Sequence, residues 1–125
     1  MTGMDELVTR LSNAAHIDRA KASAAVKTIL VFLDKEAPAD AINELVDAMS
    51  GARPVLDEGK AESAGAPGYP GFGAMAAYHA LAAAGLSGGE VQVVTKELLA
   101  YSRETVGEET TGRIVGAVPG LEAFV

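Results

Sequence analysis

Apolar residues recur at helical spacing along most of the chain, and the strict alternation typical of strands is scarce. The clearest example follows Asp18, where the apolar residues between Ala22 and Leu33 gather on one face. Asp18 is a favoured N-cap residue, so we expect a helix to begin directly after it and to run toward Lys35. The pattern predicts an all-α protein.

Two further helices are expected in the first unit of the chain, residues 1–56. One begins near Thr2, a candidate N-cap, and the other begins at Pro38, whose missing N–H breaks no bond in a first turn. Gly51 stands where a left-handed residue would end the latter helix. The first unit is therefore predicted to contain three short helices.

The stretch "RPVLDEGKAESAGAPGYPGFG" is rich in Gly, Pro and small residues, which disfavour a helix. Residues 57–71 are therefore predicted to form a linker. The second unit, residues 72–125, again contains three helical segments: "FGAMAAYHALAAAG", the segment that opens on the capping box "SGGE", and the segment between Gly107 and Pro119. Six short helices are expected in total.

The two units align without a gap when the sequence is shifted by 69 positions, so that 16–56 faces 85–125. Two helical hairpins with loops of equal length would also align in this way. We favour a duplication because the apolar pattern keeps its register through two loops and a terminal segment. The identical pairs are Lys27 with Lys96, Leu30 with Leu99, Val46 with Val115, Ala48 with Ala117, and Gly51 with Gly120.

Three short helices bury too little surface to be securely stable alone, so both units are expected to share one core. The prediction is a single domain, residues 1–125, with two tandem three-helix units related by a pseudo-two-fold axis.

The segments "AAVKTILVFLDKEAP", "KELLAYSRETVGEE" and "IVGAVPGLEAFV" resemble a family of small uncharacterised bacterial proteins built from tandem three-helix units. The resemblance covers most of the chain except the linker. It implies the helical fold, and it implies no reaction, cofactor or catalytic residue.

Charge and composition exclude several classes of function. The formal net charge of −7 and the scattered basic residues disfavour a nucleic-acid partner, whose phosphates require Lys and Arg. There is no cysteine, which excludes disulfides and thiolate chemistry. The charged N-terminal stretch "MTGMDELVTR" is unlike a secretory signal, and the apolar helical part 72–86 is too short for a membrane span. We expect a cytoplasmic protein.

Catalytic, cofactor and metal sites are not expected. His16 and His79 are the only histidines, and a transition-metal site usually recruits several ligands. His16 lies at the predicted end of a helix and is interpreted as a capping residue. For His79 a hydrogen-bonded core or interface residue is favoured over a ligand or general base. Glu108 and Glu109 are interpreted as an acidic first helical turn.

The stretch "AMAAYHALAAAGL" carries no charge on any face, so it is predicted to be buried nearly all round. Burial within the monomer, a dimer interface and an apolar pocket all remain open. The leading hypothesis is a non-enzymatic module that binds a protein partner or a second copy of itself. The alternative is an apolar small-molecule or lipid carrier with a groove between the units, and an enzyme ranks third. The candidate interface or ligand residues are Met75, Tyr78, His79, Phe32 and Tyr101.

Overall fold

The computed structural model describes residues 3–63 and 74–117, and this part of the chain is all-α, as predicted. It contains seven helices rather than six. The helices are α1 (Gly3–Ala15), α2 (Arg19–Glu36), α3 (Ala39–Ala48), α4 (Ala52–Ser63), α5 (Ala74–Ala83), α6 (Gly88–Val106) and α7 (Glu108–Ala117). The predicted N-cap Thr2 and the helix stop at Pro119 and Gly120 lie outside the described residues.

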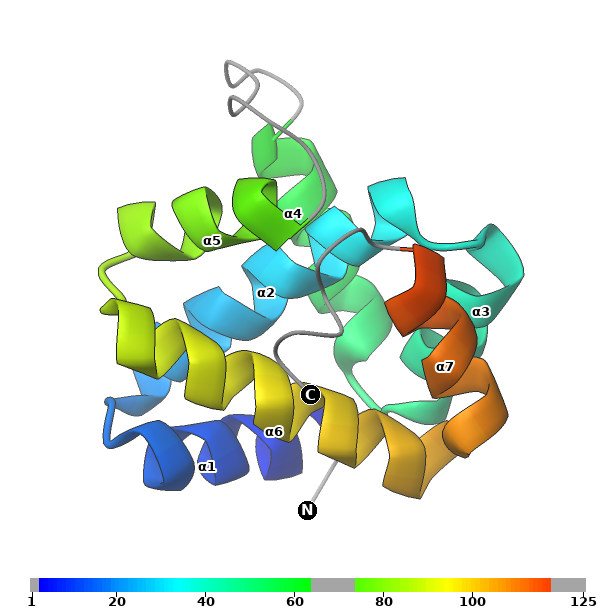
Figure 1. Cartoon of the computed structure of the whole chain (residues 1–125), viewed down its shortest axis with the longest axis horizontal. Coiled ribbons are helices and arrows are strands. Elements are labelled where there is room, and N and C mark those ends of the chain that lie inside the picture. The colour runs from blue at the N-terminus through cyan, green and yellow to red at the C-terminus, as the bar shows by residue number, and fades with distance from the viewer. Residues whose placement is uncertain (1–2, 64–73, 118–125) are drawn as a thin grey trace.

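The two longest helices, α2 and α6, organise the packing (Figure 1). Helix α1 contacts both of them, and α5 also contacts both. Helices α3 and α7 pack on each other beside α6, while α4 packs against α2 and α3. Because every helix is covered by at least two others, one continuous core forms among all seven.

The core is aliphatic. Its largest fully buried side chains are Leu, Ile and Val from all seven helices, and Tyr101 is the only buried aromatic residue among the described side chains. The fully buried set consists of Leu7, Leu11, Val26, Leu30, Leu33, Ile42, Leu45, Leu56, Leu81, Leu98, Leu99 and Ile114.

Both long helices begin at the predicted caps. Asp18 Oδ1 accepts a hydrogen bond of 2.7 Å from the backbone N–H of Lys21. Ser87 and Glu90 form the full capping box, in which each side chain accepts from the other residue's backbone N–H at 3.2 and 2.9 Å. These local bonds satisfy N–H groups that have no partner within the helix.

The predicted linker is wrong over residues 57–63, which belong to α4; residues 64–71 lie outside the described residues. Pro54 is tolerated because it stands in the first turn, where its missing N–H has no helical partner. Leu56 is fully buried, and a Cβ built on Gly59 would lie only 2.5 Å from Val31 Cγ2. Close packing against α2 thus stabilises a helix that composition alone disfavours.

Helix ends recur at the predicted offset of 69 positions, to within two residues, for α1 and α5, α2 and α6, and α3 and α7. The turns after α1 and α5 also correspond. His16 and Gly85 both have positive φ, at 57° and 102°. In each turn the next residue donates its backbone N–H to the carbonyl five positions earlier. Ile17 donates to Ser12 and Leu86 donates to Leu81, both at 3.2 Å. His16 therefore holds the predicted helix-end position, in the left-handed conformation.

Candidate functional site

Helix α5 presents an uncharged and partly exposed face. Its side chains from Tyr78 onward are described: Ala80 and Leu81 are buried, while His79, Ala82 and Ala83 are exposed and Tyr78 is half-buried. Burial within the monomer, one of the three alternatives for this helix, is therefore wrong for His79, Ala82 and Ala83. The reason is geometric, since α5 packs against α2 and α6 through Ala80 and Leu81, whereas His79, Ala82 and Ala83 stay exposed.

Tyr78 and His79 form an edge-to-face ring pair on this helix, with centroids 6.2 Å apart and an interplanar angle of 88°. Tyr78 also approaches the start of α6, because a Cβ on Gly88 would lie 2.9 Å from Tyr78 Oη. Of the two roles favoured for His79, the core role is wrong, since this side chain is exposed, and the interface role stays a prediction. The side chain of the third predicted residue of this helix, Met75, lies outside the described residues.

Phe32 and Tyr101 belong to the two long helices, α2 and α6. Phe32 is half-buried on α2 and packs against the core. Tyr101 on α6 is only 7% exposed, and its hydroxyl lies close to the start of α1, where a Cβ on Gly3 would be 3.2 Å away. Unlike His79, neither of these two candidates is fully exposed.

None of the five candidate residues lines either of two open pockets in the described part of the chain. The first, of about 470 Å³, is lined by Met4, Asp5, Val8, Arg19, Ala20, Ser23, Gly51 and Val55. The second, which we name the α6–α7 groove, has about 400 Å³ and is lined by Arg103, Glu108, Gly112, Val115 and Gly116.

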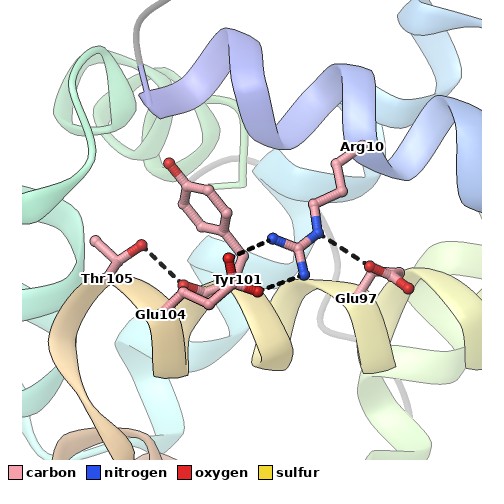
Figure 2. Close-up of polar contacts among 5 residues, drawn as sticks. All are labelled: Arg10, Glu97, Tyr101, Glu104 and Thr105. Atoms are coloured by element: carbon pink, nitrogen blue, oxygen red, sulfur yellow. Dashed lines mark hydrogen bonds and ion pairs between the residues drawn. The ribbon is translucent and has the colours of Figure 1, made fainter.

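The most extensive polar cluster connects α1 to α6 and centres on Arg10 (Figure 2). Arg10 Nε donates to Glu97 Oε2 at 3.0 Å, and its two terminal nitrogens donate to both oxygens of Glu104 at 3.1 and 2.7 Å. The guanidinium also lies 5.7 Å from the centre of the Tyr101 ring, within the range of a cation–π contact. Thr105 donates to the Tyr101 carbonyl at 2.8 Å on the same side of α6.

We name Arg10, Glu97, Tyr101 and Glu104 together the Arg10 clamp. The ionisation of these residues suits a structural role rather than acid–base catalysis. Hydrogen bonding to Arg10 lowers the pKa of Glu104, so this carboxylate stays ionised at neutral pH. Hydrogen bonding to Glu104 raises the pKa of Arg10. Burial raises the pKa of Tyr101, which keeps its hydroxyl protonated. A carboxyl acting as general acid and a tyrosinate acting as nucleophile need the opposite shifts.

Sequence reasoning missed this cluster. The spacing i, i+4 and i+7 places Glu97, Tyr101 and Glu104 on one face of a helix, and the sequence alone gives this spacing. Arg10, by contrast, is 87 positions from Glu97, and nothing in the local pattern indicates which cation meets this face.

A second polar cluster connects α3 and α6 to α7. Ser102 and Thr111 share a buried hydrogen bond of 2.7 Å between hydroxyls. Thr110 donates to Glu44 at 2.6 Å, and Arg113 pairs with Asp40. These bonds satisfy polar groups where the helices meet.

Within residues 3–63 and 74–117, no group of three or more His, Asp or Glu side chains is arranged to hold a metal ion. In the same part of the chain, none of the helices combines the length and apolarity required to cross a membrane. Glu108 and Glu109 occupy the first turn of α7, the position predicted for them.

Comparison with protein-family models, curated proteins and solved structures gives no match for this chain. The resemblance to a family of tandem three-helix proteins therefore stays a prediction. The function has to be inferred from the chain's own geometry.

Proposed function

We propose that this chain is a non-enzymatic helical module that acts through protein–protein contact, and that its partner is a second copy of itself. The observation that carries the proposal is the α5 face, which we define as Tyr78, His79, Ala82 and Ala83. This face is exposed or half-exposed and belongs to a helix without a single charged residue.

Charge favours this face as the place where two copies meet. The chain has a formal net charge of −7, so two copies repel each other wherever acidic surfaces come together. Charged residues are depleted from the centres of protein interfaces, where aromatic residues such as Tyr are enriched. The small side chains of Ala82 and Ala83 also permit two helices to approach closely.

The two sets of helices are further proposed to be related by a pseudo-two-fold axis within the monomer. The matching helix ends and the matching hydrogen bonds after α1 and α5 support this proposal. Under that relation α1, which carries the Arg10 clamp, corresponds to α5. The clamp lies on the α1 side only, because the position 69 residues after Arg10 is the exposed His79.

Sedimentation equilibrium over a range of protein concentrations tests self-association, with Ala83→Glu as the disruptive variant. Ala48→Glu is a matched control, because Ala48 is also an exposed last residue of a helix, α3. We expect the wild type and Ala48→Glu to dimerise and Ala83→Glu to remain monomeric. A wild type that stays monomeric at high concentration contradicts the proposal, as does equal dimerisation of both variants.

A further inference from the structure

Helix α4 is held on α3 by one basic side chain. Arg53 donates to Asn43 Oδ1 at 3.2 Å and to Asp47 Oδ1 at 2.7 Å. The two acceptors stand four positions apart, so they lie on the same face of α3. Val46, between them in sequence, is only 1% exposed.

On the α2 side, α4 is held by two ion pairs of opposite polarity. Lys60 of α4 lies 3.5 Å from Asp34, and Glu58 of α4 lies 3.5 Å from Lys27. Gly59, between them, permits the close approach of the two backbones, because a Cβ there would clash with Val31. The seat of α4 is thus an α2–α3 surface with a known pattern of charges.

The α6–α7 groove stands at the corresponding place in the second half of the chain. Adding 69 to the α4-binding residues Asn43, Asp47 and Asp34 gives Gly112, Gly116 and Arg103, and all three line this groove. A fourth lining residue, Val115, corresponds to Val46. Four of the five lining residues therefore correspond to the seat of α4.

Side chains at the α6–α7 groove are more exposed than their counterparts at the seat of α4. This difference is expected if a helix covers the seat of α4 and the groove is open. Val115 is half-buried, whereas Val46 is buried. Arg103 is exposed, whereas the Asp34 side chain is 25% exposed. Lys96, which corresponds to Lys27, is likewise exposed. No ion-pair partner of Lys96 or Arg103 is found among residues 3–63 and 74–117.

We infer that the α6–α7 groove is a docking site for an acidic amphipathic helix of a partner protein, seated as α4 is seated on α2 and α3. Two basic residues of α6 specify the acidity: Arg103, which lines the groove, and Lys96, seven positions earlier on the same helix. Lys96 is a lysine like its counterpart Lys27, which pairs with Glu58. The partner helix therefore needs a carboxylate at the position of Glu58. Arg103 stands at the position that corresponds to Asp34, which pairs with Lys60. Because the charge is reversed there, the partner helix needs a carboxylate where α4 has Lys60.

On the α7 side the groove differs in shape and charge. Gly112 and Gly116 have no atom within 4 Å of a built Cβ, so this wall is open and smooth. Glu108 lines the same wall, one helical turn before Gly112, and offers a carboxylate to a basic residue at the position of Arg53. An α4-like helix therefore needs one change, Lys60→Glu, to match every charge of the groove.

Two synthetic peptides with the sequence of residues 52–63 serve as probes, one unchanged and one with Lys60→Glu. Each is titrated into the isotope-labelled full chain, and amide shifts are followed by NMR. We expect the Lys60→Glu peptide to shift resonances of α6 and α7 around the groove and to bind about fivefold more tightly than the unchanged peptide. The Arg103→Glu chain should reverse this preference, because it restores the polarity of Asp34.

Equal binding of both peptides to both chains overturns the inference, as do shifts confined to other helices. A further full-length variant, Phe124→Ser with Val125→Ser, distinguishes an internal occupant. If the Lys60→Glu peptide binds this variant but not the wild type, the chain's own terminal residues fill the groove, and the partner helix is ruled out. Binding to both forms supports the partner.

Discussion

The guanidinium of Arg10 on α1 meets the carboxylate of Glu104 on α6 through two hydrogen bonds of 3.1 and 2.7 Å, across 94 positions of sequence. The same guanidinium lies over the Tyr101 ring and donates to Glu97. One side chain from the first half of the protein therefore holds three residues of the second half. Bidentate geometry distinguishes this pair from an ordinary surface ion pair.

Replacing Arg10 with Met should lower the free energy of unfolding by about 1–2 kcal/mol, because charged hydrogen bonds and a cation–π contact are lost together. Arg113→Met is the matched control, since Arg113 makes a single exposed pair with Asp40. Urea denaturation of both variants measures the difference. A loss for Arg113→Met as large as that for Arg10→Met would contradict the role of the clamp.

The Arg10–Glu104 pair should also make stability depend on pH. The folded-state pKa of Glu104 lies below its unfolded value, which is about 4.3, so the contribution of its carboxylate is fully present above that value. It is lost as the pH falls through the lower, folded-state pKa. Glu104→Gln should therefore be less stable than the wild type at pH 7, and the gap should shrink at acid pH. A gap that stays constant from pH 7 to pH 3 would show that the charge of Glu104 is not responsible.

Two glycines in helices should respond in opposite directions to the same substitution. Gly59→Ala should destabilise the protein by about 1–3 kcal/mol, because the added Cβ would lie 2.5 Å from Val31 Cγ2. Gly112→Ala should stabilise it by about 0.5–1 kcal/mol, because no atom lies within 4 Å of a Cβ there and Ala is the better helix former. Thermal denaturation compares the pair. A neutral Gly59→Ala would mean that residues 57–63 are not packed as α4.

Asp18 and Ser87, which stand 69 positions apart, should contribute equally as helix caps. Removing either side chain by Asp18→Ala or Ser87→Ala should cost about 1 kcal/mol, since one N–H at the start of α2 or α6 loses its acceptor. The double variant should lose the sum of the two. If one cap proved dispensable, the two helix starts would not be equivalent.

Local chemistry made some of this fold predictable from sequence. The starts of α2 and α6 were predicted because a cap side chain and the backbone N–H that donates to it lie within three residues of each other. The end of α1 before His16 was also predicted, although the left-handed conformation of His16 was not.

Long-range packing explains the errors. Helix α4 was predicted as linker because its stability comes from the burial of Leu56 and from the fit of Gly59 against Val31, which no local pattern encodes. The exposure of His79 was missed because hydropathy does not indicate on which side a helix has neighbours. The Arg10 clamp was missed because its partners are 87 and 94 positions away.

The most direct test of the proposed self-association is an NMR dilution series of the full chain. As the concentration rises, we predict shift changes concentrated on the α5 face, Tyr78, His79, Ala82 and Ala83, with the Ala83→Glu variant unchanged over the same range. Resonances that do not change with concentration, or changes centred on other helices, would contradict the account.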